Sequence, residues 1–325
     1  MSFAHLPRSR EYAPEERLRV SLEFTNVCNF SCPFCPQAWR DEPTPAGAPY
    51  DRAHGMLGPE VFARAVDECQ RVADTLEIGF FGEQTLHKRY VEYLRALKDR
   101  RFRLDLNTNV SFLTREMMDA WVDAQVDLVR LSLDAVTPSV FDRARPGRVR
   151  DFDGRLVEAG ERMAVVNSKV EEWLARPDHR PTRLVFVKSS HNRGDELQRF
   201  VAHWQPKLGP QDYVLAKQVL SYGGKTADPL VRAHRCNVWE LRFLMIDWRG
   251  VASPCNLDTN LDLALGSVLV DSIDSLYHGP RAQDLRRRTG CLRDLTPCRT
   301  CSDGNNWSFN ETFENPAFAP RRASA

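Results

Sequence analysis

The sequence lacks long apolar runs and shows almost no excess of either charge. Its 325 residues include 45 Lys and Arg against 44 Asp and Glu, which gives a formal net charge of +1. No stretch reaches the roughly 20 apolar residues of a membrane-spanning helix, and residues 1–20 lack the apolar core of a signal peptide. The balanced charge gives no reason to expect nucleic acid or an anionic membrane as a partner. These absences favour a cytoplasmic protein with neither of those partners.

The nine cysteines are odd in number, which together with the missing secretion signal argues against a disulfide scaffold. Cys28, Cys32 and Cys35 lie on one short segment at spacings of four and three residues. Three thiolates on so short a loop suit an iron–sulfur cluster better than a closed zinc site, which normally takes four ligands. A zinc knuckle or three unrelated buried thiols is the alternative interpretation. If a cluster forms, an iron without a protein ligand is open to a small molecule.

Segments with strand and helix periodicity alternate along residues 18–220. The first strand is expected at Leu18 to Phe24, directly before the cysteine segment, because apolar residues alternate there. This order predicts the α/β fold class, specifically a partial (β/α)6 parallel barrel whose ligands gather at the carboxyl ends of the strands. Further strands are expected at 76–80, 102–106, 128–133, 183–188 and 213–220, and helices at 59–73, 90–100, after the cap residue Thr114, and at 150–175.

The helix expected at 59–73 begins with a proline at its first position. Its periodicity predicts a buried face formed by Phe62, Val66, Cys69 and Ala73. Cys69 is therefore expected to be a core residue and not a metal ligand.

The CxxxCxxC spacing of Cys28, Cys32 and Cys35 resembles the radical S-adenosylmethionine (SAM) superfamily over about residues 18–220. The resemblance implies that these thiolates hold a [4Fe–4S] cluster that binds SAM, and that Phe34 packs near the adenine. Gly82 and Glu83 match the family's Gly-Gly-Glu-like segment, which contacts the methionine amine, although Phe81 replaces the first glycine. A turn glycine followed by a surface glutamate is the alternative. The resemblance also assigns polar strand ends to the cofactor: Asn107, Asn109, Ser132 and Asp134, with a helix N-cap as the alternative role of Asp134.

The other cysteines gather towards the end of the chain. Cys236 and Cys255 flank an expected hairpin at 243–253 with its turn at Gly250, and Cys298 and Cys301 form a CxxC pair. Four thiolates could form one site, and spacing alone allows zinc. The pattern resembles the twitch form of the SPASM extension of radical SAM enzymes, which implies one auxiliary [4Fe–4S] cluster and two clusters in all. Cys291 would be left over, close enough to the CxxC to exchange with Cys298.

We therefore expect a polar N-terminal arm at 1–17 that lies on the barrel domain, and an irregular insertion at 41–56 within that domain. The barrel domain would cover 18–220, a small twitch domain of hairpin and helix 221–310, and a C-terminal tail 311–325. No separate leader-peptide-binding domain is evident before the barrel in this sequence.

The resemblance implies reductive SAM cleavage to a 5′-deoxyadenosyl radical, fed by a donor such as flavodoxin or ferredoxin, and hydrogen abstraction from a small-molecule substrate. The layout is similar to the aminocyclitol dehydrogenase type of the butirosin pathway, which suggests antibiotic biosynthesis. Three hypotheses follow. Oxidation of a sugar or aminocyclitol alcohol would need a base, for which Lys217 and Lys188 are candidates. Redox-neutral epimerisation would need a hydrogen donor, for which Cys291 is the candidate, and maturation of a ribosomal peptide or protein is the third; a non-enzymatic iron–sulfur sensor is disfavoured.

Overall fold

The computed structural model describes residues 5–40, 50–223, 225–226, 228, 236–288, 295, 298–299, 301 and 310–318. Its centre is a ten-stranded sheet in the order β10-β6-β5-β4-β3-β2-β1-β7-β8-β9. The six strands β1 to β6 run parallel, each beside the next in the chain, so the expected partial (β/α)6 barrel is confirmed. These strands are β1 Leu18–Leu22, β2 Ala73–Ile78, β3 Arg103–Thr108, β4 Leu128–Ser132, β5 Thr182–Lys188 and β6 Tyr213–Gln218.

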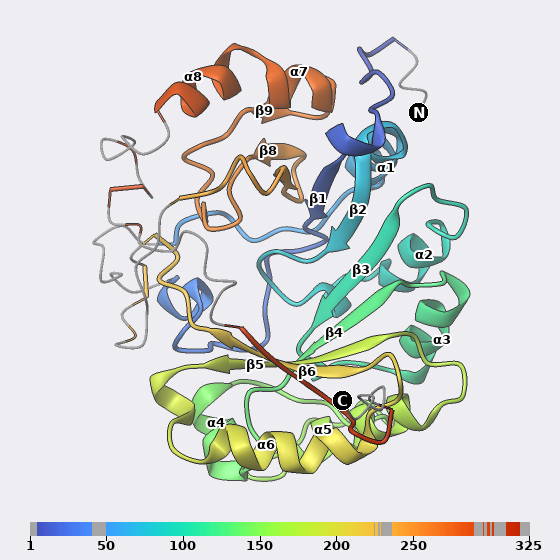
Figure 1. Cartoon of the computed structure of the whole chain (residues 1–325), viewed down its shortest axis with the longest axis vertical. Coiled ribbons are helices and arrows are strands. Elements are labelled where there is room, and N and C mark those ends of the chain that lie inside the picture. The colour runs from blue at the N-terminus through green and yellow to red at the C-terminus, as the bar shows by residue number, and fades with distance from the viewer. Residues whose placement is uncertain are drawn as a thin grey trace, which may run out of the picture.

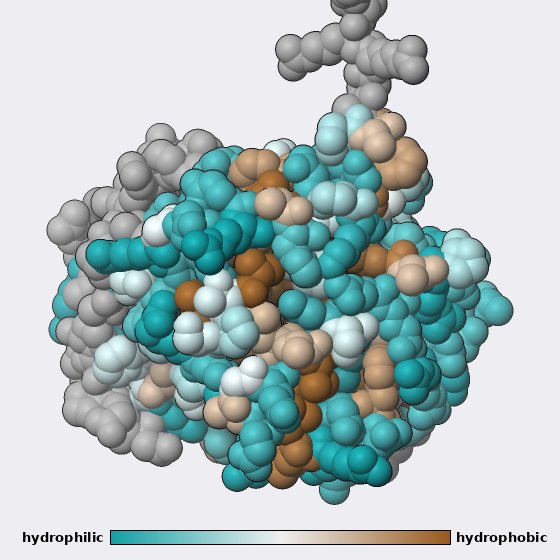
Figure 2. All heavy atoms as spheres, turned by 90° about the horizontal axis from the view of Figure 1, so that it is seen from below, coloured by the Kyte–Doolittle hydropathy of each residue, from teal (hydrophilic) through white to brown (hydrophobic). Residues whose placement is uncertain are grey.

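Helices cover the outer face of this curved sheet (Figure 1). Trp121 of α3 and Trp173 of α5 are fully buried beneath them and pack edge to face, with their ring centroids 5.0 Å apart. Seen from below, the covering layer is mostly hydrophilic, with apolar side chains confined to narrow strips (Figure 2). The helices are α1 Pro59–Val72, α2 Tyr90–Arg95, α3 Arg115–Asp123, α4 Pro138–Ala144, α5 Arg162–Ala175 and α6 Glu196–Trp204, and short 3-10 helices lie at Pro14–Glu16, Pro36–Trp39, Gln84–Leu86, Ser190–Asn192 and Gln205–Lys207.

The prediction of one helix over 150–175 is wrong in its first half, because α5 begins only at residue 162. Gly154 and Gly160 have φ values of 82° and 89°, a left-handed conformation that an α-helix excludes. The chain instead turns back on itself and forms an isolated bridge between Arg150 and Leu156. The sequence reading also missed α4. The expected cap of α3 is confirmed, since the Thr114 side chain accepts a hydrogen bond from the backbone N–H of Met117.

The buried face of α1 differs from the expected one. Cys69 is fully buried, as expected, but its neighbours on this face are Val61, Ala65 and Val72. Phe62 and Val66 are only partly buried at the edge of the core. The buried face of α1 also includes an ion pair, which the spacing of apolar residues could not predict.

That ion pair joins Arg64 and Glu68 at 3.3 Å, and both side chains are completely buried. Glu68 accepts hydrogen bonds from the Ser9 hydroxyl at 2.6 Å and from the Ile273 backbone N–H at 2.7 Å. Arg64 donates from Nε to the Val268 carbonyl at 2.9 Å. The pair therefore fastens both the N-terminal arm and the C-terminal region to α1. The arm itself contains one short 3-10 turn, Pro14–Glu16.

The C-terminal region extends the barrel sheet. Its strand β7, Phe243–Ile246, pairs parallel to β1, and β8, Val251–Ser253, folds back antiparallel after a turn in which Gly250 has a φ of 88°. The expected hairpin is therefore confirmed, and it continues the sheet. The region also contains β9 Gly266–Ser267, α7 Ile273–His278 and α8 Pro280–Arg288.

Two further segments complete the sheet and its surroundings. The segment expected to be a C-terminal tail supplies β10, Glu311–Glu314, which pairs antiparallel to β6 (Figure 1). Within the insertion, residues 50–56 are irregular as expected, whereas 41–49 lie outside the described residues. Arg52 in this insertion binds Glu23 at 2.7 Å and Asp247 at 3.5 Å, and all three side chains are buried. In the described part of the chain, no helix has the length and apolar character of a membrane span.

Candidate active site

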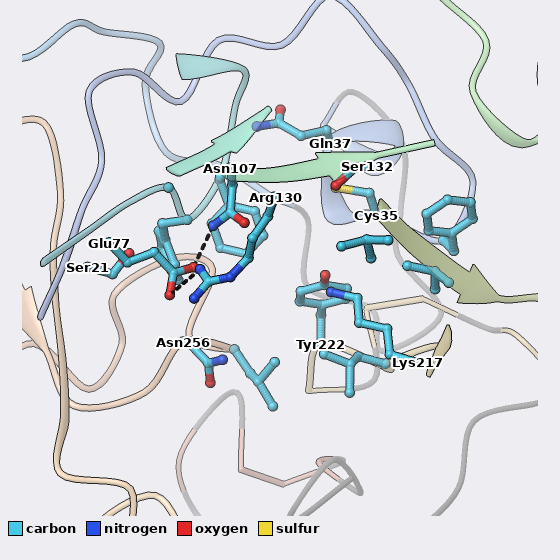
Figure 3. A pocket seen from close by; sticks show the side chains of 18 of the residues that line it. Ser21, Cys35, Gln37, Glu77, Asn107, Arg130, Ser132, Lys217, Tyr222 and Asn256 are labelled. Atoms are coloured by element: carbon cyan, nitrogen blue, oxygen red, sulfur yellow. Dashed lines mark hydrogen bonds and ion pairs between the residues drawn. The ribbon is translucent and has the colours of Figure 1, made fainter. Parts of the chain in front are cut away.

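A cavity of about 1060 Å³ opens at the carboxyl ends of the barrel strands and is bordered by the C-terminal region. All six barrel strands contribute side chains to it, because alternate residues of each strand point to the inner face. Figure 3 shows Glu77, Asn107 and Arg130 on one side of this space and Lys217 with Tyr222 on the other. The cavity therefore joins positions that are far apart in the sequence.

Cys28, Cys32 and Cys35 all line this cavity. A turn in which the N–H of Cys35 donates to the carbonyl of Cys32 at 2.9 Å keeps the loop compact. Burial raises the pKa of Cys28 to about 12, and it raises the pKa values of the other two, so burial by itself favours neutral thiols. A bound metal centre would reverse this preference, since coordinated thiols lose their protons. The three soft donors therefore fit the iron–sulfur cluster that their spacing predicts.

Arg145 stands beside this loop and was not singled out from the sequence. It lines the cavity and forms a 2.5 Å ion pair with Asp134, and its positive charge lowers the pKa of the buried Cys32 against the effect of burial. Asp134 has a φ of 64° and also accepts a hydrogen bond from the Val187 N–H at 2.6 Å. Its carboxylate thus faces Arg145 and β5, and it is not among the cavity-lining residues, whereas Ser132 is.

Glu83 lines the cavity, is almost completely buried and is surrounded by hydrogen-bond donors. Its carboxylate accepts hydrogen bonds from the hydroxyls of Thr85 at 2.7 Å and Thr108 at 2.6 Å, and from the Asn109 N–H at 2.6 Å. Burial raises the pKa of Glu83, although these hydrogen bonds oppose the shift. The neighbouring Gly82 has a φ of 83°, and a Cβ there would lie 2.3 Å from a backbone oxygen of the cysteine-bearing loop. Gly82 therefore permits the close approach of the two loops.

The other positions expected to contact SAM also reach the cavity. Phe34 is buried in its wall, and Asn107 and Asn109 line it from the end of β3. The amide of Asn109 donates to Asn29 at 3.2 Å and lies 3.9 Å from the Cys28 sulfur. Contact of these side chains with SAM stays a prediction.

A charged network forms the floor of the cavity, and the sequence analysis missed it. Arg130 binds Glu77 at 2.9 Å and also pairs with Asp105, while Arg19 pairs with Glu77 from the other side. Burial alone would raise the pKa of Glu77, but the two guanidinium groups hold it well below its usual range. Asn107 completes the network by donating to Glu77. The available signal was that each of the four charged residues of this network lies between two apolar residues of its strand.

The two candidate bases differ in their positions. Lys217 of β6 lines the cavity, and burial lowers its pKa, although Asp134 and Glu77 offset part of the shift. Lys188 of β5 does not line the cavity and forms a 2.6 Å ion pair with Glu311 of β10. Only Lys217 is thus in a position to meet a molecule in the cavity.

The four remaining predicted ligands approach the cavity from the C-terminal region. Cys236, Cys255, Cys298 and Cys301 line it, and burial raises the pKa of Cys298 to about 12, with the neighbouring thiols of Cys301 and Cys236 adding to the shift. Burial also raises the pKa of Cys255, and Asp258 and the same two thiols add to the shift. The fold therefore brings together sulfur atoms from distant segments. Cys291 lies outside the described residues.

The loop that carries Cys255 is held by one buried carboxylate, that of Asp258. It accepts hydrogen bonds from the Ser253 hydroxyl at 2.9 Å and from the N–H groups of Asp262 at 2.9 Å and Leu263 at 2.8 Å. Burial raises the pKa of Asp258 to about 6. Among the described residues, no three Cys, His, Asp or Glu side chains converge tightly enough for a single metal ion. A cluster of several irons does not require such convergence, because each thiolate can bind a different iron.

Two family matches define the class of protein. Residues 22–163 match the Radical SAM superfamily, and residues 236–302 match SPASM, an iron–sulfur cluster-binding domain. The chain thus carries a Radical SAM domain and an SPASM domain. SAM and iron–sulfur clusters are accordingly its cofactors, and the cysteines at both ends of the cavity are chemically suited to hold such clusters.

Individual relatives are more distant. The chain is 27% identical over 186 residues to a tungsten-containing aldehyde ferredoxin oxidoreductase cofactor-modifying protein of Pyrococcus furiosus, a match that covers 55% of this chain and 47% of that protein. It is 28% identical over 127 residues to a PqqA peptide cyclase of Rhodopseudomonas palustris, covering 39% of this chain and 31% of the relative. The chain thus spans half or less of the length of these curated relatives.

Solved structures resemble the whole fold. BtrN in complex with AdoMet and 2-DOIA matches with a TM-score of 0.56 and 15% identity, covering 91% of this chain and 94% of BtrN. Streptococcus suis SuiB bound to its precursor peptide SuiA matches with a TM-score of 0.61 and 11% identity, covering 89% of this chain and 71% of SuiB. At these identities the likeness establishes the shared fold alone.

Proposed function

We propose that the protein is a radical SAM dehydrogenase that oxidises a secondary alcohol of a sugar or aminocyclitol in natural-product biosynthesis. The observation that carries this proposal is one cavity lined by both sets of cysteines and by Lys217. Alcohol oxidation by this chemistry needs a radical that accepts a hydrogen atom, a base that accepts a proton and a centre that accepts an electron. The barrel cysteines, Lys217 and the C-terminal cysteines would provide for these three requirements in turn.

The residues divide between two cluster sites. Cys28, Cys32 and Cys35 would hold the SAM-binding cluster, and the four C-terminal cysteines would hold one auxiliary cluster. When bound, SAM and the two clusters supply a hydrogen-abstracting radical and an acceptor for one electron. Glu83 would accept a hydrogen bond from the methionine amine. The alcohol carbon loses a hydrogen atom and the hydroxyl loses a proton, so that release of one further electron leaves a ketone.

Lys217 is suited to take the hydroxyl proton. Its lowered pKa, a consequence of burial, increases the fraction of neutral amine, which is the form that acts as a base. No ion pair within the described ranges occupies its ammonium group. Lys188 is the weaker candidate, since its ammonium is engaged by Glu311 at the sheet edge.

Peptide modification is the second candidate. The cavity volume of about 1060 Å³ lies at the upper end of the usual range for small-molecule sites. The similarity to a PqqA peptide cyclase and to SuiB with its precursor peptide agrees with a larger substrate. The BtrN complex, in contrast, supports a small molecule.

The deciding experiment is anaerobic incubation of the reconstituted protein with SAM, a reductant and a panel of aminoglycoside-type sugars, followed by mass measurement. We expect a product about two mass units lighter than its substrate, and Lys217→Met should slow its formation by about 10²- to 10⁴-fold. The rate should rise with pH through the lowered pKa of Lys217, because only the neutral amine accepts a proton, and this rise should vanish in the variant. Lys188→Met is the matched control and should retain nearly normal turnover.

Other products would overturn the proposal. A product of unchanged mass that carries solvent deuterium at the reacting carbon would indicate epimerisation, with Cys291 as the candidate hydrogen donor. Cys291→Ala should then still consume SAM while abolishing the inverted product. Turnover of a peptide but of no sugar in the panel would favour the second candidate.

A further inference from the structure

Cations on the cavity wall fall into two groups. Arg19 and Arg130 are paired with carboxylates of the floor, and Arg145 is paired with Asp134. Arg183 of β5, Lys217 of β6 and the exposed Arg299 also line the cavity, yet none of them forms an ion pair with a carboxylate in the described part of the chain. Arg183 and Lys217 lie on neighbouring barrel strands, so two positive charges face the cavity there with no described carboxylate within ion-pair distance.

The environment of Arg183 disfavours an uncompensated positive charge. Its guanidinium lies over the Tyr213 ring, 4.9 Å from the centroid, and its Nε is shielded from solvent without a hydrogen-bond partner among the described groups. Burial and the nearby charge of Arg130 lower the pKa of Arg183, whereas Tyr213 and Asp105 oppose the shift. An anion entering the cavity would relieve both the missing hydrogen bond and the missing charge.

The wall between the two cations is apolar. Arg183 is in register with Tyr213, and Val187 is in register with Lys217, so the two cations lie four residues apart along the sheet, a rise of about 13 Å. Val185 and Leu215 line the cavity between these levels. The side chains of Arg183 and Lys217 are long and flexible enough to bring their charged groups closer together than their backbone positions. The surface suits a molecule with polar groups at its two ends.

We propose that the cavity selects a substrate with an acidic group, a carboxylate or a phosphate, which Arg183 binds while the reacting alcohol lies at Lys217. The inference extends the proposed function, because it names the class of sugar or cyclitol that the same cavity accepts. A guanidinium presents two parallel N–H groups that match the oxygens of either anion. Arg183 is then a specificity-determining residue, and neutral or amine-bearing sugars are the weaker ligands.

A purely structural role for Arg183 is the competing explanation. One oxygen of the buried Asp105, Oδ1, has no hydrogen-bond partner among the residues that the structure describes, and the Asp105 charge acts on Arg183. If Arg183 only balances Asp105, its replacement should lower the thermal stability and leave ligand preference unchanged.

The test is calorimetric titration of the anaerobically reconstituted protein with SAM present and no reductant, so that binding is measured without turnover. The probes are glucose, glucuronate and glucose 6-phosphate, which share a ring and differ in the acidic group. We expect at least one acidic probe to bind about tenfold or more tightly than glucose, and the two acidic probes separate carboxylate from phosphate recognition. Arg183→Gln should weaken binding of the preferred acidic probe by about 10- to 100-fold, the range for hydrogen bonds to charged groups, with glucose unaffected.

Two further variants complete the test. Arg183→Lys should retain part of the preference, because it keeps the charge and loses the paired N–H groups. Arg193→Gln, at an exposed loop position, should behave as the wild-type protein. Wild-type protein that binds no acidic probe more tightly than glucose would overturn the proposal, as would an unchanged preference in Arg183→Gln. Lys217→Met should keep the preference, so failure of the assigned base and failure of the anion site are distinguishable.

Discussion

The barrel loop and the C-terminal region present their cysteines in opposite ways. Cys28, Cys32 and Cys35 come from one segment of eight residues, and Cys32 at its centre is buried. The four C-terminal cysteines come from segments spread between residues 236 and 301, and Cys236 and Cys301 are exposed. The first set is organised by local sequence on a packed barrel. The second set depends on tertiary structure, so a bound cluster should itself contribute to the order of that region.

The largest effect is expected from replacing the barrel set. A triple variant, Cys28→Ala with Cys32→Ala and Cys35→Ala, should abolish SAM cleavage because it removes every protein ligand of the SAM-binding cluster. The barrel should remain folded, since its core lies on the strands and helices beneath the loop. Iron analysis should fall from about eight to about four atoms per chain, as expected when one of two cubane clusters is lost. Retained SAM cleavage would contradict the assignment of this loop.

The C-terminal set should behave differently. Cys298→Ala combined with Cys301→Ala should leave SAM cleavage measurable, reduce iron to about four atoms per chain and suppress the oxidised product. The variant should also lose thermal stability, because cluster binding joins separated segments and its free energy contributes to folding. The measurements are iron content, the ratio of 5′-deoxyadenosine to product, and thermal unfolding. Finding about one zinc and four irons in fully loaded wild-type protein would show that the C-terminal site holds no second cluster.

A smaller effect is expected at Glu83. If its carboxylate meets the methionine amine, Glu83→Ala should weaken SAM binding by about 1.5–3 kcal/mol, the range for hydrogen bonds to charged groups. Thr108→Val is the matched control, because it removes one hydrogen bond to Glu83 and leaves the carboxylate in place. Equilibrium binding measurements give the SAM affinity of both reconstituted variants, Glu83→Ala and Thr108→Val. Equal SAM affinity in Glu83→Ala and wild type would show that the residue only supports the loop.

The smallest effect is expected at Cys69. This thiol is fully buried on the core face of α1 and, unlike the two sets of predicted ligands, does not line the cavity. Cys69→Ala should lower the free energy of unfolding by about 1 kcal/mol, typical of a modest loss of core packing, and leave iron content unchanged. Denaturant unfolding and iron analysis test the two statements, and a loss of iron would place Cys69 among the ligands.

Much of the barrel was accessible from sequence because its signals are local. The alternation at 18–24 and the proline at the start of α1 depend on neighbouring residues, and so does the CxxxCxxC spacing. The predicted site residues Gly82, Asn107, Ser132 and Lys217 all line the observed cavity because strand ends converge at one edge of a parallel sheet.

The missed features depend on contacts between distant residues. The Glu77–Arg130 pair requires the register of β2, β3 and β4, and the Arg64–Glu68 pair requires the C-terminal region to cover α1. A prediction from periodicity assigns polar residues to the exposed face of a helix. It therefore excluded Arg64 and Glu68 from the buried face of α1 and placed that face incorrectly. The helix expected from residue 150 failed for a local reason, since two glycines in left-handed conformation interrupt it.

The pairing of β7 with β1 has a consequence for any shortened form of the protein. Over four successive residue pairs, from Arg19 with Phe243 to Leu22 with Ile246, β7 covers the backbone edge of β1. Removing the chain from residue 236 onward would leave β1 as an open edge strand, with apolar Val20 and Leu22 and unsatisfied N–H and C=O groups. An isolated barrel domain should therefore self-associate edge to edge and precipitate. The C-terminal region thus protects the solubility of the barrel, independently of any electron that its cluster accepts.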